Sequence, residues 1–139
     1  MSNFKQPLNI PVSRTHYKLV EEYRYLLSVE GQIHMVIVPE GFVYDGASVP
    51  RILWSISGLT KDGLLRGAAL VHDFVYHHKG KLPKGSLFVD TEKGFVAIPT
   101  HISKKQADKT FKQMMRIAGV GKFKSHIAYL AVRLFGPRF

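Results

Sequence analysis

The segment Leu70–Tyr76 constrains the fold of this chain more than any other part of it, because three polar side chains interrupt an apolar run there. On a helix, successive residues are rotated by about 100°, so His72 and Asp73 point about a quarter-turn apart and Tyr76 projects between them one turn later. A buried ionisable group without a partner costs several kcal/mol. We therefore expect this helix to pack against another element that supplies partners for these groups.

Asp108 is the expected partner, because it shares one helical face with apolar residues further along the chain. The residues of that face lie three, seven and ten positions after it: Phe111, Met115 and Ala118. A carboxylate that faces the core needs a hydrogen-bond donor, and we expect His72 or Tyr76 to supply it. A carboxylate bonded to a histidine fixes the tautomer of the imidazole and raises its basicity.

This predicted cluster has two interpretations. In the catalytic one, His72 is a general base and Asp108 and Tyr76 support it. In that case Asp73 and Asp45, which lies in a glycine-containing loop, are candidate ligands for calcium or magnesium, because such ions prefer oxygen donors. In the structural one, the same side chains form a hydrogen-bond network that holds the helices together. The sequence leaves this choice open.

Two β-hairpins are predicted from alternating polar and apolar residues. The first joins 23–29 to 33–38 across Glu30 and Gly31, and the second joins 87–89 to 95–98.

Three main helices are predicted from helical spacing. The first runs from Asp62 to about His78, and the second begins at a capping box of Ser103 and Gln106 and stops near Gly119. The third ends at Gly136 and has an apolar face, which consists of Phe123, Ile127, Leu130, Ala131 and Leu134.

These elements predict an α+β fold in which antiparallel hairpins pack against about three helices. A length of 139 residues fits one domain. We expect residues 1–22 to form an N-terminal arm and residues 23–139 to form a single globular domain, with a hairpin insertion near 82–100. The chain has no cysteine, and no apolar run approaches the ~20 residues of a membrane span. We see no signal peptide and expect a soluble protein without transmembrane insertion.

Positive charge is concentrated near the end of the chain. The net charge is +10, and nine of the twenty Lys and Arg residues but only one of the ten acidic residues lie from Ser103 onward. This imbalance favours an acidic partner, either nucleic acid or another anionic surface. The alternative is a solvated helix face. The candidate contacts are Lys104, Lys105, Lys109, Lys112, Arg116, Lys122 and Lys124.

Three blocks of the sequence resemble an uncharacterised family of small proteins encoded by tailed bacteriophages and prophages. The blocks are residues 41–51, which include Asp-Gly-Ala-Ser-Val-Pro, residues 68–76 with His-Asp-x-x-Tyr, and Ala107-Asp108 with Phe111. The resemblance implies a phage origin without implying an activity. We expect a virion-associated or late-gene accessory protein, a tail, baseplate or connector component, located in the virion or the host cytoplasm. Its partners would be other phage structural proteins.

Residues 72–76 also resemble the His-Asp-x-x-Tyr active-site helix of secreted phospholipases A2. That resemblance implies that His72 activates water, Asp73 holds calcium, and Tyr76 orients a distant aspartate that corresponds to Asp108. The chain departs from those enzymes because it lacks their flanking cysteines and their glycine-rich calcium loop.

Three functions follow as hypotheses. The first is the phage accessory protein. The second is a metal-dependent hydrolase, which requires His72 and Asp108 within about 3 Å of each other beside a solvent-accessible cleft. The third is a basic nucleic-acid-binding protein, whose binding would weaken steeply with added salt.

Overall fold

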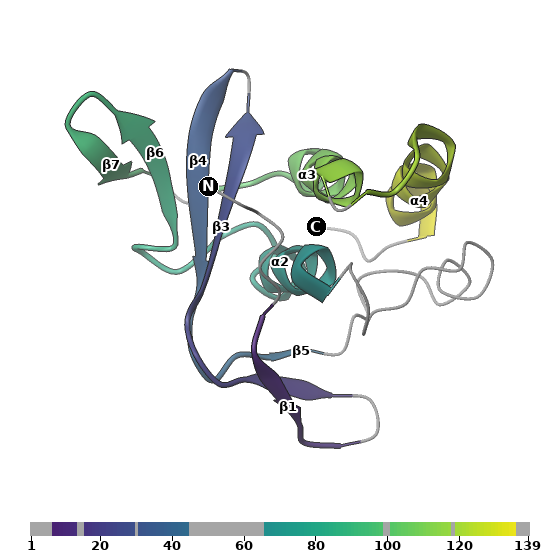
Figure 1. Cartoon of the computed structure of the whole chain (residues 1–139), viewed down its shortest axis with the longest axis horizontal. Helices are drawn as coiled ribbons and strands as arrows, with labels where there is room; N and C mark the ends of the chain where they lie inside the picture. Colours follow the sequence, from purple (N-terminus) through teal and green to yellow (C-terminus); the bar gives the residue numbers. More distant parts are fainter. Residues whose placement is uncertain are drawn as a thin grey trace.

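The computed structural model describes residues 7–13, 16–29, 31–44, 66–98, 101–117 and 119–135, without the side chains of residues 27–29 and 66. Within these ranges the chain forms two antiparallel sheets and three helices (Figure 1). The predicted α+β class is confirmed. None of the described helices is both long and apolar enough to cross a membrane.

The two predicted hairpins form one four-stranded sheet. Its order is β3-β4-β6-β7, with bounds Tyr23–Val29, Gln32–Val38, Leu87–Thr91 and Gly94–Ala97. β6 pairs with β4, so the hairpin expected as an insertion extends the first hairpin into a larger sheet. Gly31, just before β4, has a φ of 79°, which glycine adopts without the strain that a side chain would introduce.

A second, smaller sheet has the order β1-β2-β5. Its strands are β1 (Asn9–Pro11), β2 (Tyr17–Leu19) and β5 (Val43–Tyr44). Part of the segment expected to be an N-terminal arm is therefore paired into the domain, and Leu19 is completely buried in the core. These strands were not predicted, because two or three residues are too few to show a period of two.

The three helices lie side by side, with α2 (Arg66–His77) at the centre of the molecule (Figure 1). Every residue from Gly67 to Tyr76 is buried. α3 (Lys104–Ile117) packs against α2, and α4 (Lys122–Phe135) packs against an adjacent side of α3, far from the four-stranded sheet. The expected start of the first helix at Asp62 lies outside the described residues.

The predicted capping box at the start of α3 is confirmed. The backbone N–H of Gln106 donates to Ser103 Oγ at 3.1 Å, and the backbone N–H of Ser103 donates to Gln106 Oε1 at 3.0 Å. These reciprocal bonds satisfy two donors that the first turn of a helix leaves unpaired. The cap fixes where α3 begins and thereby the position of Asp108, one turn further on.

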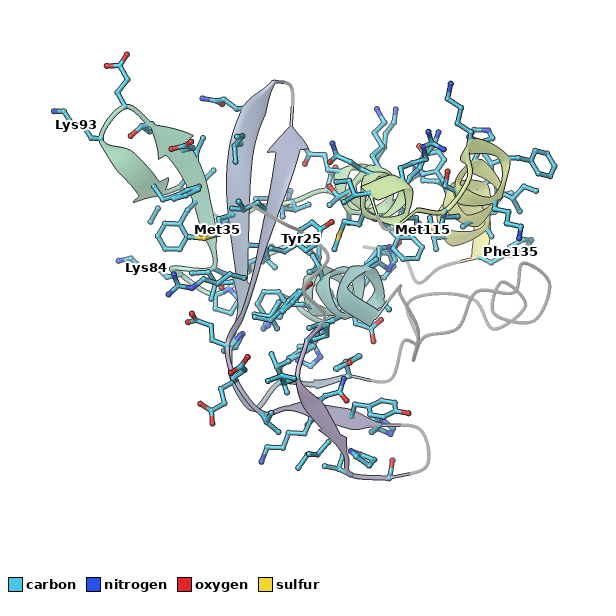
Figure 2. The ribbon with its side chains drawn as sticks, in the orientation of Figure 1. Tyr25, Met35, Lys84, Lys93, Met115 and Phe135 are labelled. Carbon is cyan, nitrogen blue, oxygen red and sulfur yellow. The ribbon has the colours of Figure 1, made fainter. Side chains whose placement is uncertain are left out.

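α4 packs with the face opposite to the apolar one predicted from its sequence. The residues that it buries are small or medium-sized: Ser125, Ala128 and Val132. The large residues of the predicted apolar face lie on the outer side, where Phe123 is 76% and Leu134 69% exposed. Phe135 also lies at the outer side of α4 (Figure 2).

Candidate functional site

The three side chains expected to form a cluster do meet between α2 and α3. His72 Nε2 lies 2.8 Å from Asp108 Oδ1, and Tyr76 Oη donates a short hydrogen bond to the same oxygen. The side chains of His72 and Asp108 have no solvent-exposed surface. Helical periodicity thus correctly identified the partners of this carboxylate.

Two cations complete the environment of Asp108 from its other side. Lys104 Nζ donates to Asp108 Oδ2 at 3.0 Å, and Arg133 Nη1 of α4 donates to the same oxygen at 3.2 Å. Lys104 also donates to the backbone carbonyls of Val132 at 2.9 Å and Arg133 at 3.3 Å. One carboxylate on α3 is therefore bonded to side chains of α2, α3 and α4.

Sequence reasoning assigned Lys104 to the basic surface and missed Arg133. Lys104 lies four residues before Asp108, a helical spacing at which opposite charges meet, so a sequence signal for this pair existed. Arg133 is 25 residues from Asp108 in sequence, and only the packing of α4 on α3 brings them together. The ammonium group of Lys104 belongs to the internal cluster, whereas Lys105, Lys109, Lys122 and Lys124 are exposed.

The charge of this cluster follows from its hydrogen bonds. Burial alone would raise the pKa of Asp108, but the bonds from His72, Tyr76 and Lys104 lower it to about 2. Asp108 is thus an anion at neutral pH, and His72 Nε2 must carry the proton that it shares with the carboxylate. Burial and the adjacent carboxylate raise the pKa of Tyr76, so its hydroxyl stays protonated and donates.

A cavity of about 470 Å³ lies next to this cluster, between the four-stranded sheet and helices α2 and α3. His72 and Phe111 are part of its wall, and the two rings are in contact at a centroid distance of 4.7 Å. The hydrolase hypothesis required a short His72–Asp108 distance and an accessible cleft. The distance is confirmed and a cleft is present, but the imidazole has no exposed surface within it.

The structure describes only one of the two candidate metal ligands. Asp73 is on α2 and is 8% exposed. Asp45 lies outside the described residues, so its position relative to Asp73 stays a prediction. Within the described ranges, no group of three His, Cys, Asp or Glu residues could hold a metal ion. The calcium or magnesium site expected at Asp73 and Asp45 stays a prediction.

Comparison with known proteins identifies the family. A family described as "Protein of unknown function (DUF1353)" matches residues 17–132. The chain belongs to this family. The predicted membership in a family of unknown function is thus confirmed, while the phage origin that the sequence blocks implied stays a prediction.

The amino-acid sequence is also similar to that of a protein from Sinorhizobium fredii (strain NBRC 101917 / NGR234). The chain is 33% identical over 100 residues to its "Uncharacterized protein y4jT". The match covers 72% of this chain but 24% of that protein, so the chain spans about a quarter of its relative's length. No solved structure matches the chain. For this DUF1353 protein, function has to be inferred from its own residues.

Proposed function

We propose that this protein is an accessory component of a phage particle that docks on a neighbouring protein through the outer face of α4. The sequence blocks that resemble phage proteins support the particle context. The observation that carries the proposal is the reversed packing of α4, which turns four large apolar side chains outward on one stripe. We call these residues the outer stripe: Phe123, Ile127, Leu130 and Leu134.

The outer stripe has the geometry of a helix that binds in a groove. Its residues follow the spacing i, i+4, i+7 and i+11, which places them along one side of a helix. They are between 38% and 76% exposed, and none of them belongs to the apolar core that the described residues form. Exposed apolar residues occur singly on most proteins, whereas a continuous stripe indicates an interaction site.

Charge indicates the chemistry of the partner. Lys122 and Lys124 are exposed in the first turn of α4, beside Phe123 at the beginning of the stripe. An apolar groove with an acidic rim would complement this arrangement. In this proposal the Asp108 cluster is structural, because Lys104 and Arg133 attach α4 to α3 and hold the outer stripe toward the solvent.

The test compares two double variants in particles. We expect mass spectrometry to find the wild-type chain in gradient-purified virions, and we expect Phe123→Ser with Leu134→Ser to be lost from them. The matched control is Ile33→Ser with Val96→Ser, which replaces two apolar residues of the sheet that are 46% and 48% exposed. The control should be incorporated normally. Virions without the wild-type chain, or equal incorporation of both variants, would contradict the proposal.

Hydrolysis is a second candidate function, and the position of His72 on the cavity wall favours it. A hydrolase would use the imidazole of His72, held by Asp108 at Nε2, as the general base for a water that attacks an ester or amide. Phe111 would have to move before substrate reached the ring, because the imidazole is buried. The metal-dependent form of this candidate, with Asp73 and Asp45 as ligands, is tested by adding calcium or magnesium.

The assay for this candidate uses p-nitrophenyl butyrate and phospholipid vesicles, each with and without added calcium or magnesium. A hydrolase would release product with wild-type protein and lose at least about 99% of that rate in His72→Asn, since a general base contributes roughly 10²-fold or more. Phe111→Leu, which opens access to the ring, would retain or increase the rate. An equal rate for wild type and His72→Asn would reject this candidate.

A further inference from the structure

We infer that the cavity between the four-stranded sheet and α3 binds a small amphiphilic anion, a molecule with an apolar body and one negatively charged head group. This inference is independent of the docking proposal and does not require His72 to be catalytic. The cavity volume of about 470 Å³ lies within the roughly 300–1,000 Å³ range of small-molecule sites. Well-packed interiors leave few voids larger than a water molecule.

The side of α3 that faces the sheet explains why the space is open. Residues on this side recur at i, i+3, i+4 and i+7, as a packed helix face would, but they are polar: Gln106, Lys109, Thr110 and Gln113. Burying these groups directly against the sheet would leave their hydrogen bonds unsatisfied. α3 therefore packs on α2 through Asp108 and Phe111 and presents its polar side to the cavity.

The deeper wall of the cavity is apolar. It is formed by side chains of α2, the sheet and α3, which are Val36, Val71, Val75, Leu87, Phe111 and Met114. An aliphatic or aromatic body placed there would remove this surface from water, which stabilises binding by about 25 cal/mol for each Å² buried.

The polar part of the lining selects a negatively charged head group. Besides the four polar residues of α3, it includes His34 of β4 and His101 before α3. Amide, hydroxyl, ammonium and imidazole groups can all donate hydrogen bonds, and Lys109 carries a positive charge. The described lining residues include no Asp or Glu. A carboxylate, sulfonate or phosphate placed against this polar part of the lining would accept hydrogen bonds from these groups and would face no negatively charged lining side chain among the described residues.

Calorimetric titration with sodium decanoate tests the inference, with decyltrimethylammonium as a probe of the same chain length and opposite charge. We expect one decanoate to bind per chain, and the cationic probe to bind at least about tenfold more weakly. Equal affinity for both probes, or no binding of decanoate, would overturn the inference.

Variants then locate the binding site. Thr110→Trp fills the cavity and should weaken decanoate binding at least about tenfold. Lys109→Gln should weaken binding about fivefold. The charge control is Lys93→Gln at the tip of the β6–β7 turn (Figure 2), which does not line the cavity, and it should have no effect.

Two results would place the ligand elsewhere. Decanoate could bind the outer stripe of α4, in which case Phe123→Ser would weaken binding and Thr110→Trp would not. Loss of binding in Lys93→Gln equal to that in Lys109→Gln would show a general charge effect. Either result overturns the inference, and thermal unfolding of each variant verifies that it is folded.

Discussion

The carboxylate of Asp108 is held as an anion inside the core because protein donors replace its hydration shell. His72 and Tyr76 bond one oxygen, and Lys104 and Arg133 bond the other. A buried charge of this kind is tolerated only when it is paired and hydrogen-bonded. At the residue scale, stability should therefore depend on Asp108 more than on any exposed acid.

Asp108→Asn should lower the free energy of unfolding by about 3 kcal/mol at pH 7, since it leaves the buried His72 and the half-buried Lys104 and Arg133 without their anion. The pKa of Asp108 is lowered to about 2 from an ordinary value of 3.8. The stabilisation is then fully present above about pH 4 and is lost as the pH falls toward 2. Denaturant unfolding of both proteins between pH 2 and 7 should show that the difference between their free energies of unfolding decreases as the pH falls from about 4 to 2.

Asp90→Asn is the control for this prediction, because Asp90 is exposed on β6. It should change stability by less than about 0.5 kcal/mol at any pH. A difference between wild type and Asp108→Asn that stays constant down to pH 2 would show that the carboxylate is not the stabilising group.

The sequence indicated the His72–Tyr76–Asp108 contacts because a core-facing carboxylate and a core-facing imidazole each require a partner. It could not indicate Arg133, because nothing in an isolated helix shows which neighbour it will pack on. The imidazole is buried, as expected of a core-facing group, and the ring of Phe111 on α3 contacts it.

At the element scale, the hairpins and the start of α3 follow from local chemistry. Alternation over five to seven residues predicts a strand with one buried face, and a serine with a glutamine three residues later satisfies the first turn of a helix. The strands β1, β2 and β5 have two or three residues each and carry no comparable pattern.

Ser103→Ala should lower the free energy of unfolding by about 1 kcal/mol, because the N–H of Gln106 loses its acceptor. Calorimetric melting measures the change. Lys105→Ala in the same turn is the matched control and should stay within about 0.5 kcal/mol of wild type. Equal effects of the two changes would mean that the cap contributes nothing specific.

Whole-molecule organisation depends on how α4 is attached. Its buried face is narrow, and Lys104 adds hydrogen bonds from α3 to the carbonyls of Val132 and Arg133. Lys104 thereby couples the last turn of α4 to the buried carboxylate. Removing these hydrogen bonds should make local opening of α4 more frequent without a comparable increase in the sheet.

Lys104→Met keeps the apolar stem of the side chain and removes the ammonium group. Amide hydrogen exchange in the last two turns of α4 should become about tenfold faster, while β3 and β4 keep their protection. Lys109→Met, five residues later on α3, should leave α4 unchanged. Faster amide exchange throughout the chain would contradict this prediction, because it would show that the substitution destabilises the whole fold and not α4 alone.

The amino-acid sequence by itself determined the class of fold, the hairpins, the helix cap and the identity of three clustered side chains, because periodicity and unmet hydrogen-bonding needs are local properties. Tertiary structure alone decided which face of α4 is buried, that Lys104 and Arg133 join the cluster, and that a cavity opens beneath α3. Those outcomes depend on the distance and angle between packed elements. The outer stripe shows the reason most directly, because its spacing is the same whether it faces a core or a partner.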